Sequence, residues 1–228
     1  MSTAGRLAEP QVEAMFDRIA SVYDLMNSVM TAGMHQRWRE RTAELARVAA
    51  GSRALDVATG TGDLAVALGE RGAGVVGVDF AEKMLEIARR KAPQIDFRQG
   101  NALALEFPDD SFDAATVGFG ARNFSDLDQG LREMARVVRP GGRVVVLEIT
   151  TPQRPPLSLF FRLWFDSVVP LLGRVAGDSD AYEYLPSSVR RFPDPYDLAA
   201  RMAAAGMTDV RWLLTAGGII AIHSGTVT

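Results

Sequence analysis

Residues 54–63 read ALDVATGTGD, and this stretch decides the fold of the chain. An apolar run leads into a loop that contains Gly60 and Gly62, and a helix is expected to begin at Asp63. Glycines allow such a loop to bring its backbone close to a ligand. Taken alone the motif is ambiguous. GTGDLA at residues 60–65 also fits the dinucleotide fingerprint, and a tight strand-to-helix turn with no ligand can contain the same glycines.

Strand-like and helix-like segments alternate outward from this loop. Apolar runs predict strands at residues 53–58, 74–78, 95–99, 112–119 and 143–149. Helices are predicted between them at residues 63–70, 81–91 and 127–138. This alternation implies parallel strands in an open, doubly wound α/β sheet, whose ligands bind beyond the carboxyl ends of the strands.

The flanks of this core have a different pattern. Residues 11–22 and 34–49 predict N-terminal helices, and residues 155–191 are helical and aromatic. A helix at 194–205 precedes two closing strands at 208–214 and 218–223, which brings the sheet to seven strands. We therefore expect one domain over residues 1–228. It comprises N-terminal helices and a lid (1–50), a cofactor-binding core (51–150), and a helical insertion with closing strands (151–228).

Composition narrows the class of protein. The net charge of -3 and a pI near 5.5 disfavour a nucleic-acid partner, which usually requires a basic excess. The absence of cysteine excludes disulfides and thiol nucleophiles, and two histidines offer no convincing metal site. Neither a secretory signal nor a membrane span is predicted, so we expect a cytoplasmic protein.

Four features bear on the cofactor, and the last three of them choose it. Asp79, at the end of the second predicted strand, can accept hydrogen bonds from ribose hydroxyls, which identifies a nucleoside without choosing between nucleosides. Asn101 and Ala102 follow the third strand, where an amide oxygen and a backbone N–H can read an adenine edge. The run RVVRPGGRVVVLE at residues 136–148 is arranged as in class I methyltransferases. The chain also lacks room for the second half of a dehydrogenase, so S-adenosylmethionine is favoured over a nicotinamide cofactor.

Four segments resemble the ubiquinone/menaquinone biosynthesis C-methyltransferase family. They are YDLMNSVMTAGMHQRW (23–38), FGARN (119–123), RVVRPGGRVVVLEIT (136–150) and YEYLPSSVRRFP (182–193). The resemblance covers residues 16–223. It implies a class I fold and C-methylation of a prenylated quinol, closest to the members that act on demethylmenaquinol. The alternatives are C-methylation of a polyprenyl benzoquinol in ubiquinone biosynthesis and methylation of a small molecule of another pathway.

The resemblance also implies which residues bind the cofactor. Relatives often have serine where this chain has Gly118, which puts one cofactor contact in question. The predicted cofactor site consists of Asp56, Gly60, Thr61, Gly62, Asp79, Phe80, Asn101, Ala102 and Gly118.

Catalysis requires a ring carbon that becomes nucleophilic when a quinol hydroxyl ionises. The resemblance implies that Arg122 and Asn123 act in this step, and we expect Arg122 to stabilise the oxyanion while a bound water takes the proton. The alternative is that Arg122 pairs with an acidic lid residue. Tyr23 is expected to bind a quinol oxygen and Asp24 to accept a proton, unless both only form a hydrogen-bonded corner.

Several other side chains are assigned simpler roles. His35 is interpreted as capping or packing, Trp38 as core, and the basic runs 89–91 and 190–191 as solvated helix faces. Residues 155–172 are strongly apolar and are predicted to form a buried lid helix. The alternatives for this segment are a groove for the prenyl tail, peripheral contact with the inner face of the membrane, or a homodimer contact.

Overall fold

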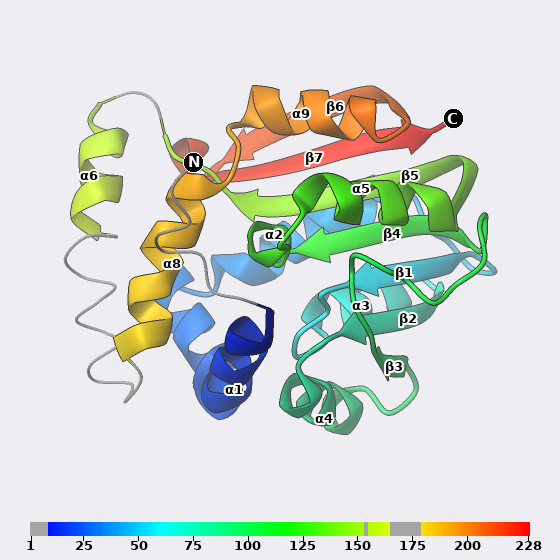
Figure 1. Ribbon diagram of the computed structural model, residues 1–228, viewed down its shortest axis with the longest axis horizontal. Helices are drawn as coiled ribbons and strands as arrows, with labels where there is room; N and C mark the ends of the chain where they lie inside the picture. Colours follow the sequence, from blue (N-terminus) through cyan, green and yellow to red (C-terminus); the bar gives the residue numbers. More distant parts are fainter. Residues whose placement is uncertain (1–8, 153–154, 165–178) are drawn as a thin grey trace.

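The computed structural model describes residues 9–152, 155–164 and 179–228, and it contains a seven-stranded sheet of order β3-β2-β1-β4-β5-β7-β6 (Figure 1). The strands from β3 to β5 are parallel, whereas β7 runs antiparallel to both β5 and β6. The strands are β1 (Arg53–Val57), β2 (Gly74–Asp79), β3 (Asp96–Gln99), β4 (Phe112–Gly118), β5 (Val138–Ile149), β6 (Met207–Thr215) and β7 (Ile220–Val227). This confirms the predicted class I, doubly wound architecture.

Helices cover both faces of the sheet because the strand residues are apolar on both sides. Side chains from α5 and α9 pack on one face, and side chains from α2, α3 and α4 pack on the other. The helices are α1 (Glu9–Thr31), α2 (Met34–Leu45), α3 (Asp63–Gly69), α4 (Glu82–Lys91), α5 (Leu127–Val137), α6 (Leu157–Leu163), α8 (Ser179–Arg191) and α9 (Pro195–Ala204).

The first helix is longer than the sequence analysis predicted. It continues from Glu9 to Thr31, because Pro10 lies in the first turn, where proline is tolerated, and no other proline or glycine occurs before Gly33, where φ is +75°. Tyr23 and Asp24 therefore lie on a helix and not in a corner of the chain. The helix packs against α4 and α8 beside the carboxyl ends of the strands (Figure 1).

The helix α6 differs from the predicted buried lid. Phe161 is buried, but Leu159 and Leu163 are 64% and 62% exposed. One face of this short helix thus packs against the rest of the protein, and the opposite face is exposed. Because the segment is apolar on more than one face, its composition does not show which face is buried. Residues 165–172 of the predicted lid lie outside the described residues.

Candidate functional site

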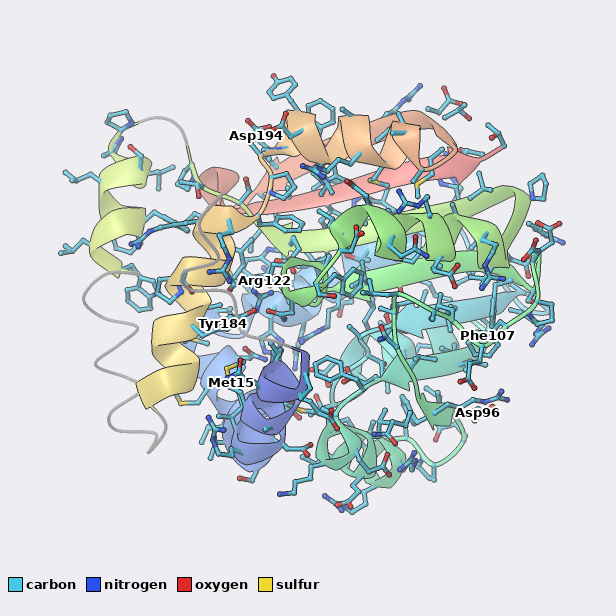
Figure 2. All side chains as sticks on the ribbon, in the orientation of Figure 1. Met15, Asp96, Phe107, Arg122, Tyr184 and Asp194 are labelled. Atoms are coloured by element: carbon cyan, nitrogen blue, oxygen red, sulfur yellow. The ribbon has the colours of Figure 1, made fainter. Side chains whose placement is uncertain are left out.

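Two adjoining cavities open at the carboxyl ends of the parallel strands. The first, of about 250 Å³, lies over the loop after β1 and the ends of β2, β3 and β4. The second, of about 390 Å³, lies between α1, α2, α6 and α8. Figure 2 shows Arg122, Met15 and Tyr184 gathered at this end of the sheet, away from Asp96 and Phe107. Five residues border both cavities: Phe16, Tyr23, Arg39, Phe119 and Asn123.

The glycine loop after β1 forms part of the wall of the first cavity. Gly60 has a φ of +57°, and a Cβ built there would meet nothing within 4 Å, so a ligand can approach this backbone. At Gly62, with φ at +85°, a Cβ would come within 2.8 Å of the Phe97 ring. Gly62 does not border the cavity that the described residues form. The close approach of Phe97 gives Gly62 a packing role as well, and its contact with the cofactor stays a prediction.

Asp79 ends β2 and holds its carboxylate at the wall of the first cavity. Its Oδ2 accepts a hydrogen bond from the Gly60 backbone at 2.8 Å, and Oδ1 accepts one from the Ala81 backbone at 2.9 Å. These bonds fix the carboxylate, and the Phe80 backbone N–H also interacts with it. Burial raises the pKa of Asp79 to about 6, although the backbone hydrogen bonds oppose the rise. The geometry suits two adjacent ligand hydroxyls.

Asp56 lies on β1 in the same wall and is only 1% exposed. Its Oδ1 accepts the Thr116 hydroxyl at 2.7 Å and its Oδ2 the Thr59 hydroxyl at 2.6 Å. Burial raises the pKa of Asp56 to about 6, against the lowering effect of both hydroxyls and of the Arg39 charge. A buried carboxylate of this kind favours a cationic ligand group beside it.

The residues after β3 complete the wall beyond Asp79. Asn101 and Ala102 border the first cavity, together with Phe80. The Asn101 Oδ1 atom accepts the Leu103 backbone N–H at 2.8 Å, so one lone pair of the amide oxygen is used within its own loop. The structure thus brings these three residues to the cavity that also contains Asp79.

Gly118 ends β4 and also borders the first cavity. A Cβ built at this position would lie 3.1 Å from Cδ2 of Leu64, which is itself buried. A serine at this position would therefore require Leu64 to shift by a few tenths of an ångström. In this chain the Leu64 side chain packs into the space that a side chain at position 118 would need.

Arg122 follows β4 in a short 3₁₀ turn, η1 (Ala121–Asn123), and pairs with a carboxylate of the sheet. Its Nη1 donates to Glu148 Oε1 at 3.0 Å, to Glu148 Oε2 at 3.1 Å and to the carbonyl of Phe119. Both side chains of the ion pair are buried, with exposed fractions of 8% and 1%. Arg122 is thus paired, as one sequence-based alternative held, but its partner lies on β5 and not in a lid.

Two buried polar atoms beside this ion pair have no hydrogen-bond partner among the described residues. They are Nε of Arg122 and Oδ1 of Asn123. Arg122 borders the second cavity, and Asn123 borders both. Because an unpaired buried donor or acceptor costs free energy, this pair marks a place suited to a polar ligand group.

Asp24 is held in ion pairs and hydrogen bonds away from the cavities. Its Oδ1 accepts the Thr61 hydroxyl at 2.6 Å, and its Oδ2 accepts Lys91 Nζ at 2.7 Å. Burial alone would raise the pKa of Asp24, but the bonds from Lys91 and Thr61 hold it below the usual value. Asp24 borders neither cavity as the described residues form them. It joins α1 to the glycine loop, which gives no support to a role as proton acceptor.

Sequence reasoning did not assign Lys91 or Arg39 to the site. Lys91 was interpreted as solvated, but its Nζ also binds Asp63 Oδ1 at 2.6 Å. Arg39 is buried and borders both cavities. A signal for Arg39 was its spacing, since it follows His35 by four residues on the same helix face. His35 and Trp38 are buried, so the predicted packing roles are confirmed.

The comparisons with known proteins agree with one another. A model of the ubiE/COQ5 methyltransferase family matches residues 5–227. The demethylmenaquinone methyltransferase of Thermus thermophilus is 50% identical over 218 residues, which cover 92% of this chain and 99% of that protein. The ubiquinone/menaquinone biosynthesis C-methyltransferase UbiE of Rhodopseudomonas palustris is 43% identical, covering 95% of this chain and 91% of that protein.

Solved structures support the fold but do not specify the reaction. An S-adenosylmethionine-dependent methyltransferase of Thermotoga maritima, described as a possible histamine N-methyltransferase, has a TM-score of 0.69 at 20% identity, covering 94% of this chain and 99% of that one. The [4+2]-cyclase SpnF has a TM-score of 0.68 at 20% identity, covering 95% of both chains. The family match and the sequence relatives are decisive: the chain belongs to the ubiE/COQ5 methyltransferase family.

Proposed function

We propose that this protein methylates a ring carbon of a prenylated quinol, demethylmenaquinol, with S-adenosylmethionine as the methyl donor. The observation that carries the proposal is the shared wall between the two cavities. A cavity built around the Asp79 carboxylate adjoins a larger cavity with a mainly apolar lining. Relatives named demethylmenaquinone methyltransferase support the choice of a naphthoquinol over a benzoquinol.

The first cavity has the donor groups that S-adenosylmethionine requires. The Asp79 carboxylate, fixed by two backbone amides, would accept the ribose hydroxyls. Asn101, Ala102 and Phe80 would hold the adenine, and the loop at Gly60 and Thr61 would lie under the rest of the cofactor, near Asp56 and Gly118. When bound, the cofactor supplies an electrophilic methyl group on a sulfonium.

The second cavity suits a quinol ring that carries a flexible apolar tail. Methionine side chains adapt to irregular apolar ligands because they are unbranched and polarizable. Tyr23 borders this cavity and the first, and we expect its hydroxyl to bind a quinol oxygen beside the donor. The apolar lining includes Met15, Met26, Met30, Met34, Trp38, Phe161 and Trp164.

Arg122 and Asn123 are the residues that we assign to catalysis. Asn123 Oδ1, which is buried and unpaired among the described residues, would accept a quinol hydroxyl. Arg122 Nε would donate to the quinol oxygen as negative charge develops there. Arginine stays protonated, and the Asp24 carboxylate is held by Lys91 and Thr61. We therefore expect a water molecule to take the quinol proton.

The substrate assignment is tested by incubating the protein with S-adenosylmethionine and short-tailed demethylmenaquinone, with and without a chemical reductant. Mass spectrometry should show one added methyl group on the naphthoquinol and none on the quinone kept oxidised, because the quinone has no hydroxyl to ionise. A parallel reaction contains a polyprenyl benzoquinol precursor. Faster methylation of the benzoquinol, or equal rates with and without reductant, would contradict the proposal.

We further propose that the mouth of the second cavity contacts a lipid surface at the inner face of the cell membrane, where a prenylated quinol resides. Val29, Met34 and Phe160 border this cavity and are 45–55% exposed. Leu159 and Leu163 add exposed apolar side chains on α6. Nowhere in the described ranges is a helix long and apolar enough to cross a membrane. The proposed contact is therefore peripheral.

Flotation with lipid vesicles tests this contact. A variant with Leu159→Asp and Leu163→Asp should lose vesicle binding while methylating a short-tailed quinol at the parent rate, because neither side chain borders the cavities. Light scattering provides the control. A parent protein that is dimeric, does not float with vesicles and becomes monomeric in this variant would show that a homodimer covers this face instead.

A further inference from the structure

We propose that Arg39 binds the α-carboxylate of the methyl donor, beside Asp56, which receives the α-ammonium group. The inference rests on the proposed function, since it assigns the amino-acid end of the donor to one end of the first cavity. It gives a specific role to a residue that is far from the glycine loop in the sequence.

Arg39 occupies a distinctive position in the first cavity. Its side chain is only 8% exposed, and it borders both cavities from α2. Among the described residues that border the first cavity it is the only cation, whereas Glu13, Asp56 and Asp79 are acids. A ligand with a carboxylate can thus find a charged partner in this cavity at Arg39.

The guanidinium of Arg39 is fixed by contacts that leave donors available. Its Nη1 lies 3.1 Å from Asp63 Oδ2 and also contacts Nδ1 of His35. The Nε2 atom of His35 lies 3.2 Å from the Ser28 hydroxyl. Burial and the Arg39 charge lower the pKa of His35, so a neutral imidazole accepts from the guanidinium. Both contacts involve Nη1, and a guanidinium has five N–H donors.

The surroundings of Arg39 match the two charges of an amino acid. Asp56 lies near enough for the Arg39 charge to lower its pKa, and both residues border the same cavity. Asp63 is shared between two cations, because it also binds Lys91 at 2.6 Å. Its single negative charge therefore does not fully neutralise Arg39. An α-ammonium beside Asp56 and an α-carboxylate beside Arg39 would place each ligand charge next to its opposite.

The opposite end of the cavity suits the nucleoside. Asp79 ends β2, and Asn101 and Ala102 follow β3. Asp56 lies on β1, which is nearer the centre of the sheet than β2 and β3. Arg39 also lies over the Phe119 ring, with Cζ 5.9 Å from the ring centroid, at the end of β4. The cation therefore lies beside the second cavity and away from Asp79, so a donor bound between them would have its sulfonium between the two ends of the cavity.

Calorimetry with two matched ligands tests the assignment. S-adenosylmethionine and its decarboxylated form differ by the carboxylate alone, and both keep the sulfonium, the amine and the nucleoside. Arg39→Met should weaken binding of S-adenosylmethionine about 10- to 100-fold and change binding of the decarboxylated form less than about twofold. Arg39→Lys should show a smaller loss, because it keeps the charge without the planar fork. Arg41→Met is the control, since Arg41 lies on the same helix and pairs with Glu44 at the surface.

Each other outcome is informative. An equal loss for both ligands would overturn the assignment and make Arg39 a structural residue. Unchanged binding of both ligands with slower quinol methylation would also overturn it, in favour of a contact with the quinol. If Arg39→Met does not fold, the ratio of the two affinities in Arg39→Lys decides. A parent protein that binds neither ligand would contradict the proposed function itself.

Discussion

Arg122 and Glu148 form a buried ion pair that joins the end of β4 to β5, with Nη1 at 3.0 and 3.1 Å from the two carboxylate oxygens. Glu148 Oε2 also accepts the backbone N–H of Ile149 at 2.9 Å. The carboxylate therefore holds the guanidinium in one orientation, while Nε of Arg122 has no hydrogen-bond partner among the described residues. Removing the arginine would leave a buried charge without its partner.

The first prediction separates the structural role of Arg122 from its catalytic role. Arg122→Met alone should lower the free energy of unfolding by about 3–5 kcal/mol, because Glu148 stays charged and buried. Adding Glu148→Gln should recover most of that loss. Methyl transfer in a single turnover should fall roughly 100- to 1000-fold in both variants, since both lack the donor to the oxyanion. A double variant that transfers methyl at the parent rate would exclude Arg122 from catalysis.

The second prediction concerns Asp79 and pH. The ionised carboxylate accepts ribose hydroxyls, and burial raises its pKa to about 6. Affinity for S-adenosylmethionine should therefore fall as the pH drops from 7.5 to 5, because protonation removes an acceptor. Asp79→Ala should bind about 2–4 kcal/mol more weakly at pH 7.5, with a smaller dependence on pH. Asp56 titrates in the same range and stays in both proteins, so the difference between the two pH profiles reports Asp79.

The third prediction tests the role of Asp24. Asp24→Asn and Lys91→Met should each raise the dissociation constant for S-adenosylmethionine roughly two- to tenfold, because both weaken the attachment of α1 to the glycine loop. The rate of methyl transfer at saturating ligands should stay within about threefold of the parent rate. A general base typically contributes 100-fold or more. A loss of that size in Asp24→Asn, but not in Lys91→Met, would restore Asp24 as the proton acceptor.

The fourth prediction concerns stability in acid. His223 on β7 is buried, stacks on Trp212 and lies with Nε2 at 2.9 Å from the carbonyl of Pro195. Burial lowers its pKa from 6.5 to about 4, so the folded state favours the neutral ring. The resulting stability is present above pH 6.5 and is lost as the pH falls towards 4, by about 3 kcal/mol in total.

Urea unfolding at pH 8, 6 and 4.5 measures this effect. Compared with the parent, His223→Gln should lose less stability on acidification, because glutamine keeps a donor for Pro195 and does not titrate. His35 remains in both proteins and cancels in the comparison. Parallel pH profiles for the two proteins would show that His223 is not the group responsible.

The sequence predicted the sheet and much of the first cavity because those features depend on local patterns. Buried strands are recognisable as apolar runs, and polar residues at their carboxyl ends meet at one edge of a parallel sheet. Asp79 and Asn101 were predicted on these grounds, and the structure places both at the first cavity. The pattern does not reveal that Gly62 packs against Phe97, because Phe97 lies on another strand.

The remaining features depend on contacts between distant parts of the chain. Lys91 and Asp24 are 67 residues apart, so a basic run on α4 gave no sign of its partner on α1. The partner of Arg122 is on β5, and nothing near Arg122 in the sequence identifies it. The length of α1 is different, because the absence of glycine and proline between Pro10 and Gly33 was visible in the sequence.

The helix α1 borders both cavities with one continuous face, through Phe16 and Tyr23. A displacement of this helix that uncovers one cavity also uncovers the other, because the helix has no break between these two residues. If the donor and the quinol bind in the two cavities as proposed, a displacement of α1 from α4 and α8 would open both ligand sites in one motion.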